Sequence, residues 1–219
     1  MKRLISALYN ESSPFQFIFD EQIATQDPSD LKTTKASALI IWGGEDISPS
    51  IYGHELSSKT GAQKEPSIRD RLEMQFAKQA IELGIPIIGI CRGAQLMCAV
   101  SGGTLIQHVT GHAIIGGHLV VTNDKKEFVT NSVHHQMLNP FKVDHELLAW
   151  CPTKLSRVYI GPNDTLVNEA YAKDFKEPEI VWFPKTKALC IQGHPEYGNA
   201  QLPFIRYCLK LVEERIFTA

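Results

Sequence analysis

The sequence contains no block of basic residues and no long apolar run. No run of lysine or arginine exceeds two residues, and 22 basic residues are nearly balanced by 24 acidic ones. The chain therefore lacks the concentrated positive charge with which proteins bind nucleic acid or anionic membranes. No segment is apolar over the length that a transmembrane helix requires. We expect no nucleic-acid partner, no membrane association, and a small uncharged or zwitterionic ligand.

The sequence also lacks paired cysteine motifs and a complete leader peptide. Its five cysteines are an odd number and include no Cys-x-x-Cys pair, which argues against a disulfide framework or a zinc knuckle. The apolar residues that follow Lys2-Arg3 are interrupted by Asn10-Glu11 before a signal-peptide core is complete. We therefore expect a reduced, cytoplasmic protein.

Apolar patterns along the chain predict alternating strands and helices. The runs 2–8 and 38–42 are typical of strands, whereas 68–83 has helical apolar spacing, ends at Gly84 and is followed by the buried strand 85–90. A second helix is expected over 92–101, where Gly102-Gly103 ends it, and an amphipathic helix over 201–217. Short β-rich segments occupy the region between them, at 117–122, 127–133, 146–150, 157–160, 179–183 and 188–192.

These elements predict an α/β fold. We expect a doubly wound, three-layer, flavodoxin-like domain with a mixed, mostly parallel central sheet. A chain of 219 residues buries about 70 to 75% of its unfolded surface in one core, so we expect a single domain over 1–219. The polar, Pro-containing stretch 9–37 gives no assignment.

Cys91 stands at the junction between a predicted strand and a predicted helix, within Gly89-Ile90-Cys91-Arg92-Gly93. This is the pattern of a nucleophile elbow, which we expect to be exposed. The N–H groups and the partial positive charge of a helix N-terminus favour a thiolate. A lone cysteine after an apolar strand is usually a small core residue. The flanking glycines and a distant His194-Pro195-Glu196 string favour the nucleophile instead, because His194 supplies a base and Glu196 an acid that orients it.

The string Gly89-x-Cys91-x-Gly93-x-Gln95, followed much later by His194-Pro195-Glu196, resembles the class I glutamine amidotransferases and their hydrolytic relatives. Residues 131–136, Asn-Ser-Val-His-His-Gln, are similar to the gamma-glutamyl-gamma-aminobutyrate hydrolase branch. The resemblance covers roughly residues 39–197 and includes Gly43-Gly44 after a strand. Arg69-Asp70 also matches, and we assign it no chemical role. Two positions depart from the family pattern: Trp42 replaces a common proline, and Gly193 replaces a common aromatic residue.

The resemblance implies hydrolysis of a γ-glutamyl amide through a cysteine thioester. Cys91 would attack the γ-carboxamide carbon, His194 would carry the proton, and Glu196 would fix the histidine tautomer. No metal and no organic cofactor is required. The resemblance further assigns the oxyanion hole to the backbone N–H groups of Gly44 and Arg92. It places the following residues around the substrate: Gly43, Gln95, Ser132, His134 and His135.

Four functions remain open from the sequence. The first is a hydrolase that acts alone on glutamine or a γ-glutamyl amine. The second is a glutaminase subunit that delivers ammonia to a separate synthetase partner. The third keeps the elbow but follows the α/β-hydrolase order, with Asp164 or Glu169 as the acid and a carboxyl ester as substrate. The fourth is a non-catalytic binding domain, and a homo-oligomer is compatible with all four.

The eight histidines raise the question of a metal site. His108 and His112 are spaced for one helical face, and His118 lies nearby, but the intervening glycines argue against a continuous helix. We find no carboxylate or cysteine in the sequence neighbourhood that completes a ligand set. The sequence therefore predicts no metal site, and it leaves four cysteines as bystanders: Cys98, Cys151, Cys190 and Cys208.

Overall fold

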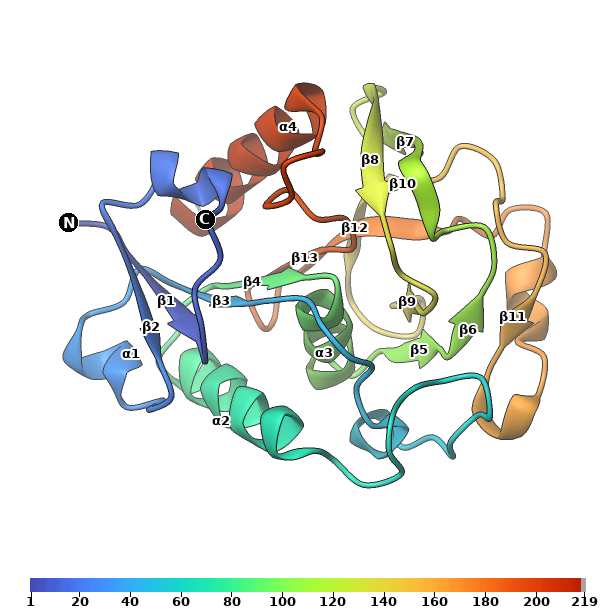
Figure 1. Ribbon diagram of the computed structural model, residues 1–219, viewed down its shortest axis with the longest axis horizontal. Helices are drawn as coiled ribbons and strands as arrows, with labels where there is room; N and C mark the ends of the chain where they lie inside the picture. The colour runs from blue at the N-terminus through green and yellow to red at the C-terminus, as the bar shows by residue number, and fades with distance from the viewer. Residues whose placement is uncertain (218–219) are drawn as a thin grey trace.

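The computed structural model describes residues 1–217 and has a mixed sheet with helices on both faces (Figure 1). Within these residues, nine strands form this sheet, in the order β2 (Glu21–Thr25), β1 (Arg3–Ala7), β3 (Ala38–Ile41), β4 (Ile87–Ile90), β13 (Ala188–Ile191), β12 (Pro178–Phe183), β10 (Glu146–Trp150), β7 (Ile114–Thr122) and β8 (Glu127–Ser132). In this sheet order, the first five strands, β2, β1, β3, β4 and β13, pair in parallel. The last four, β12, β10, β7 and β8, are added antiparallel. The predicted mixed α/β architecture is confirmed.

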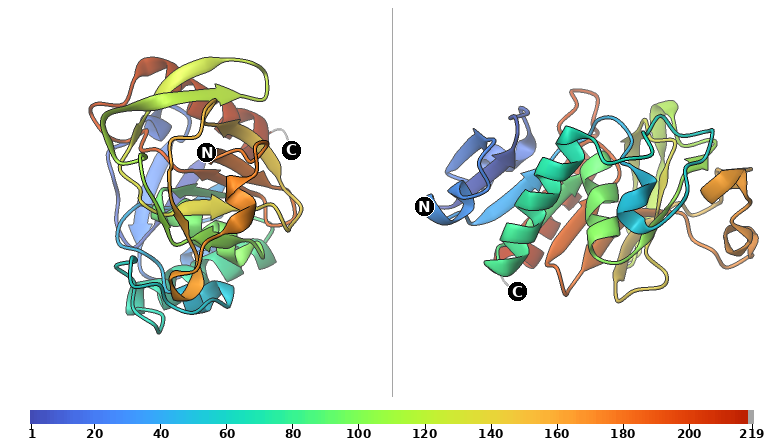
Figure 2. Two further views of the ribbon diagram at one scale, coloured as in Figure 1. Left: turned by 90° about the vertical axis from the view of Figure 1, so that its right-hand side faces the viewer. Right: turned by 90° about the horizontal axis from the view of Figure 1, so that it is seen from below.

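Helices cover both faces of the sheet because successive strand residues point to opposite sides. Ile41 faces the layer that contains α1 (Asp30–Thr33), α2 (Ile68–Glu82) and α3 (Arg92–Val100). Ile40 faces the opposite layer, which contains α4 (Leu202–Val212), η1 (Pro14–Phe17) and η5 (Glu213–Phe217). Figure 2 shows α2 and α3 side by side on one face of the sheet. Among residues 1–217, each helix is too short or too polar to cross a membrane.

Smaller elements extend the molecule beyond the antiparallel half of the sheet. Two short antiparallel pairs lie there, β5 (Thr104–Ile106) with β9 (Met137–Asn139) and β6 (His108–Val109) with β11 (Tyr159–Ile160). Three short helices complete this part of the structure: η2 (Pro49–Tyr52), η3 (Pro162–Asp164) and η4 (Asn168–Tyr171). Ile106, Val109, Met137, Tyr159 and Ala170 form a separate small core cluster here. Tyr52 of η2 belongs instead to the core that contains α2 and α3.

Most predicted elements appear within a few residues of their expected bounds, and the exception is the unassigned stretch 9–37. It contains η1, α1 and the strand β2, which pairs in parallel with β1 at the edge of the sheet. An edge strand has one open side, so its sequence need not be apolar. In β2 none of the five residues is buried, and the apolar Ile23 is only partly covered. The strand therefore carries little of the pattern that identifies strands in a sequence.

Candidate functional site

Cys91 lies in a sharp turn between β4 and α3. Its backbone has φ +49° and ψ −106°, a conformation that is strained for a residue with a side chain. The two neighbouring glycines make the turn possible. A Cβ on Gly89 would come within 2.6 Å of the carbonyl oxygen of Gly93, and a Cβ on Gly93 would overlap the carbonyl of Ile41. The Gly-x-Cys-x-Gly pattern thus reflects the close packing of α3 on β4 and β3.

His194, from the chain after β13, lies next to Cys91 and Glu196. Its Nδ1 is 2.7 Å from Glu196 Oε1, so Nε2 is the nitrogen left for Cys91. Asn131 at the end of β8 fixes the backbone of His194 twice, since its Oδ1 accepts from His194 N–H and its Nδ2 donates to the His194 carbonyl, at 2.9 and 2.7 Å. Tyr197 stacks on the imidazole with ring centroids 4.2 Å apart. These contacts hold the ring from three sides.

The electrostatics of the site favour a charged imidazole. Burial lowers the pKa of His194, but Cys91 and Glu196 outweigh that effect and raise it to about 10. His194 is therefore protonated at neutral pH and lies beside the Cys91 sulfur, where it can donate a proton to a leaving group. The expected exposed elbow needs correction, because the Cys91 residue is only 7% exposed.

Cys91 nevertheless opens into a cavity of about 140 Å³. The cavity is lined by Gly44, Asp46, Cys91, Gln95, Val133, His134, His135, His194 and Tyr197. Its lining comes from the carboxyl ends of β3, β4, β8 and β13, where a doubly wound sheet usually binds its ligand. Three far-separated parts of the sequence therefore meet around the sulfur.

The Gly43–Gly44 turn after β3 is held in place by Arg69. The guanidinium donates to the carbonyls of Gly43 and Trp42 at 2.7 and 3.3 Å, and Tyr9 donates to the same Gly43 carbonyl at 2.9 Å. Gly44 adopts φ +142°, and a Cβ there would collide with the guanidinium of Arg69. Arg69, to which we assigned no chemical role from the sequence, therefore supports this turn.

Arg92 combines a backbone N–H at the start of α3 with a fully buried side chain. It is the first residue of α3, so its N–H is one of the groups that no carbonyl of the helix can accept. Its guanidinium is 2.5 Å from Asp70 Oδ1 and also pairs with Glu73 on α2. This buried ion network joins the start of the elbow helix to α2.

Gln95 and His135 lie at the cavity, but their surroundings differ. Gln95, one turn into α3, is 3% exposed and its Nε2 lies 3.5 Å from the Gln136 carbonyl. His135 is partly exposed and its Nε2 lies 3.0 Å from Asp46 Oδ2. The hydrogen bond to Asp46 raises the pKa of His135. Asp46, which was not among the predicted site residues, thus becomes a candidate binding residue.

His134 lines the Cys91 cavity, but both nitrogens of its ring have neighbours outside that cavity. The two ring nitrogens of His134 point to the Gln136 carbonyl, at 2.8 Å, and to Glu179, at 3.5 Å. Ser132 is buried and lines a neighbouring cavity instead. The expectation that no carboxylate accompanies the histidines is wrong, because His112, His118 and His134 converge on Glu179 of β12, which is far away in the sequence.

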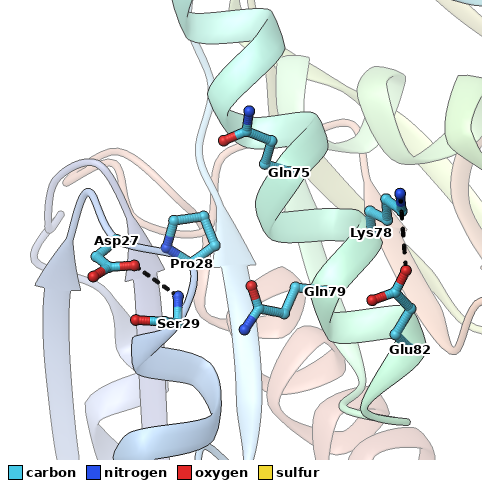
Figure 3. Close-up of a pocket in the computed structure, with 7 residues that line it drawn as sticks. All are labelled: Asp27, Pro28, Ser29, Gln75, Lys78, Gln79 and Glu82. Carbon is cyan, nitrogen blue, oxygen red and sulfur yellow. Dashed lines mark hydrogen bonds and ion pairs between the residues drawn. The ribbon is translucent and has the colours of Figure 1, made fainter.

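A second cavity of about 260 Å³ adjoins the first and shares Val133, His194 and Tyr197 with it. The remaining lining residues are Ala113, Ile114, Ile115, Gly116, Gly117, Asn131, Ser132 and Asn199. A third hollow of about 370 Å³ lies between α2 and the turn before α1 (Figure 3) and shares no lining residue with the other two. Its polar groups pair locally, for example Ser29 N–H with Asp27, so the site is assigned to the first two cavities.

The two departures from the family pattern have structural explanations. Trp42 is buried and its Nε1 donates to Ser6 Oγ at 2.6 Å, so it anchors the end of β3 to β1. A Cβ on Gly193 would lie 3.0 Å from the Asn131 carbonyl and the Phe204 ring, which leaves no space for an aromatic side chain.

The alternative acid Asp164 is bound elsewhere, because its carboxylate accepts from Ser57 and Ser58. Glu169, the other alternative, lies in η4, beyond the antiparallel half of the sheet. The acid next to His194 is Glu196.

The fold and the site define an α/β protein with a cysteine elbow. A family model described as Peptidase C26 matches residues 23–120. The chain is 42% identical over 203 residues to the putative glutamine amidotransferase-like protein RP404 of Rickettsia prowazekii (strain Madrid E), covering 74% of this chain and 70% of that protein. The chain belongs to the class I glutamine amidotransferase-like, peptidase C26 family.

Other similarities cover less of the relatives or show the fold alone. The gamma-glutamyl-CDP-amidate hydrolase of Campylobacter jejuni is 34% identical over 117 residues, 53% of this chain and 50% of that protein. The chain spans 52%, 62% and 25% of the lengths of three further curated relatives. The crystal structure of a glutamine amidotransferase (tm1158) from Thermotoga maritima superposes with a TM-score of 0.59 at 15% identity, covering 99% of this chain and 86% of that one.

Proposed function

We propose that the protein hydrolyses a γ-glutamyl amide, as the gamma-glutamyl-gamma-aminobutyrate hydrolase branch does, with Cys91 as nucleophile, His194 as acid and base, and Glu196 as the residue that orients His194. The observation that carries the proposal is the position of His194, 2.7 Å from Glu196 and beside Cys91 in one cavity. A cysteine at a helix N-terminus, a base and an orienting acid are the parts that covalent acyl transfer requires.

The reaction proceeds in two halves. The Cys91 thiolate attacks the γ-carboxamide carbon, and the developing oxyanion accepts hydrogen bonds from the backbone N–H groups of Gly44 and Arg92. His194 donates its proton to the leaving nitrogen, the C–N bond breaks, and a γ-glutamyl thioester remains on Cys91. Neutral His194 then takes a proton from water, which attacks the thioester. The C–S bond breaks, glutamate leaves, and the thiolate–imidazolium pair is restored.

The γ-glutamyl half is assigned to the smaller cavity. The Asp46 carboxylate would attract the substrate α-ammonium group, and the His135 side chain and the N–H groups around Val133 would face the α-carboxylate. Gln95 would hydrogen-bond the substrate's own amide. These assignments follow from the charges that line the cavity and from the placement of Cys91 at one end of it.

The amine half is assigned to the second cavity, which adjoins His194. Its size supports an amine larger than ammonia, and therefore a hydrolase that acts alone rather than a subunit that supplies ammonia. Apart from His194, its lining residues carry no ionisable side chain except the Tyr197 phenol, and they include Ile114, Ile115 and Val133. An uncharged, apolar amine suits this lining better than an anionic one.

The test is turnover of a panel of γ-glutamyl amides by the purified chain. We expect an apolar substrate such as γ-glutamyl benzylamide to be cleaved faster than glutamine or γ-glutamyl-γ-aminobutyrate. Mass spectrometry should show the released amine and a γ-glutamyl adduct on Cys91. Cys91→Ala should lower kcat by about 10⁴-fold or more.

Cys98→Ala is the matched control, because burial raises the pKa of Cys98 to about 12 and keeps that thiol unreactive. This variant should keep both the adduct and the turnover. The proposal fails if the chain forms no adduct on Cys91. It also fails in its present form if glutamine is the one amide of the panel that is hydrolysed and if its hydrolysis requires an added synthetase.

A further inference from the structure

Four buried side chains from distant parts of the sequence converge beside the pocket. They are His112, just before β7, His118 on β7, His134 between β8 and β9, and Glu179 on β12. Each residue is at most 6% exposed. One ligand atom from each lies within 4.8 Å of the others. Two strand connections and two strands are thus brought to one point.

The distances fit a tetrahedral metal ion. Three ring nitrogens surround the same carboxylate oxygen, Glu179 Oε1, with His112 Nδ1 at 3.2 Å, His118 Nε2 at 3.4 Å and His134 Nε2 at 3.5 Å. Zinc binds nitrogen and oxygen at about 2.0–2.2 Å, so the ligand atoms of a tetrahedral site stand about 3.3 Å apart. The three nitrogen–oxygen separations match three edges of such a tetrahedron, and the ligand atoms of the four residues all lie within 4.8 Å of one another.

Hydrogen bonds do not account for these atoms. Within residues 1–217, no partner of normal hydrogen-bond geometry is found for His112 Nδ1, His118 Nε2 and His134 Nε2, the three nitrogens that face Glu179 Oε1. The other carboxylate oxygen, Glu179 Oε2, is also unpaired, and Oε1 itself has one weak donor, Cys151 Sγ at 3.5 Å. Buried polar atoms of native proteins are almost always paired. Several unpaired lone-pair donors aimed at one point therefore indicate a ligand that binds them all.

The surrounding groups fix the histidines in the orientation that a metal requires. His134 Nδ1 lies 2.8 Å from the Gln136 carbonyl, to which it donates, and this leaves the Nε2 lone pair toward Glu179. His112 Nε2 lies 3.2 Å from Glu177 Oε2. Glu177 is itself held by Tyr159 Oη at 2.6 Å and by the Leu155 N–H at 2.8 Å. Such carboxylate–histidine contacts orient the ligands of many metal sites.

We propose that His112, His118, His134 and Glu179 form a structural zinc site. Three imidazoles and one carboxylate are a ligand set that Zn²⁺ accepts, and four protein ligands with no solvent-accessible position are typical of a structural ion rather than a catalytic one. The site fixes the β8–β9 connection, which carries Val133 and His135, to β12. It therefore holds the wall of the Cys91 cavity, although the proposal does not depend on the reaction at Cys91.

The metal content of the full chain, purified without a polyhistidine tag or a metal resin, tests the proposal. We expect about one zinc per chain by elemental analysis. After removal of zinc by a chelator, added Co²⁺ should give the visible absorption bands of tetrahedral coordination, without a thiolate charge-transfer band from the nearby Cys151. Zinc removal should also lower the melting temperature.

Three variants separate this site from a general effect of histidine loss. His118→Asn should abolish stoichiometric zinc, and Glu177→Gln should keep the stoichiometry but weaken zinc affinity by about 10–100-fold. His145→Asn is the matched control, because His145 contacts the Val143 carbonyl outside the cluster, and it should retain zinc. If His118→Asn does not fold, the cobalt spectrum and Glu177→Gln decide the question.

The proposal is overturned if the chain contains no zinc and the chelated protein gives no tetrahedral Co²⁺ spectrum. In that case the cluster is a proton-sharing network. Burial lowers the pKa of His112, but Glu177 and Glu179 outweigh it and raise it to about 9, so the network would hold its proton on His112. A thiolate charge-transfer band would overturn the assigned ligand set.

Discussion

His194 is fixed by two residues that follow it closely in the sequence, Glu196 and Tyr197, and by one distant residue, Asn131. Glu196 binds Nδ1, Asn131 binds the backbone on both sides, and Tyr197 covers one face of the ring. The ring therefore has little freedom to move away from Cys91. A base held in this way loses little conformational entropy when the transition state forms.

The raised pKa of His194 predicts a pH-dependent contribution to stability. The imidazole has a pKa of about 10 in the folded protein against 6.5 in the unfolded chain. The folded state therefore holds its proton more tightly, and the stabilisation is complete below pH 6.5 and decreases as the pH rises from 6.5 through about 10. The difference in free energy of unfolding between wild type and His194→Gln should shrink over this window in urea titrations.

Glu196→Gln serves as the companion variant for this measurement. It removes one of the two groups that raise the pKa of His194, so its pH dependence should lie between those of wild type and His194→Gln. Parallel curves for all three proteins between pH 6.5 and 10 would contradict a raised pKa at His194.

At the scale of elements, the elbow depends on how closely α3 approaches the sheet. Gly93 sits against the Ile41 carbonyl at the end of β3, and Gly89 sits under the first turn of α3. The strained backbone of Cys91 is sustained by this packing and by the hydrogen bond from Cys91 N–H to the Ile191 carbonyl at 2.8 Å.

Gly93→Ala should destabilise the protein although alanine is the better helix former. The intrinsic preference favours alanine by about 1 kcal/mol, but its Cβ would overlap backbone that cannot move freely, and overpacking typically costs about 1–3 kcal/mol. We expect a net loss in urea titration together with a drop in turnover, because the start of α3 is displaced.

Gly198→Ala provides the matched control, since no atom lies within 4 Å of the added Cβ. It should leave stability within about 0.5 kcal/mol of wild type. If Gly93→Ala were equally neutral, the close approach of α3 to β3 could not be the reason for glycine at position 93.

At the scale of the whole molecule, buried charges connect the elements around the site. Arg92 on α3 pairs with Asp70 and Glu73 on α2, and Arg69 joins Glu73 to the Gly43–Gly44 turn. This network lies between the two helices of one face and the end of β3. It links the stability of the fold to the position of the proposed oxyanion hole.

Arg92→Met should destabilise the protein by about 3–5 kcal/mol, because the buried Asp70 and Glu73 carboxylates lose their main counter-ion. Arg71→Met is the control, since Arg71 is exposed on α2, the helix that carries Asp70 and Glu73, and should change stability by no more than about 0.5 kcal/mol. Chemical denaturation measures both. Equal effects of the two changes would show that the network does not stabilise the fold.

How well the sequence predicts an element depends on how much of that element is buried. In the parallel half, short-range apolar patterns predict β1, β3, β4, α2 and α3 nearly to their ends, because each element buries a continuous face. The edge strand β2 is missed because one side of it is open. Asp46 and Tyr197 are missed as site residues because neither belongs to a motif with chemical meaning of its own.

The sequence by itself determined the alternation of strands and helices and the elbow at Cys91, because periodicity and a glycine-flanked turn are properties of neighbouring residues. It also indicated His194 and Glu196, whose relation spans only two positions. Only the tertiary structure brought Arg69 to the Gly43–Gly44 turn, and Glu179 to three histidines from β7 and from two strand connections. Those contacts depend on strand order and register, which bring together residues that are dozens of positions apart in the chain.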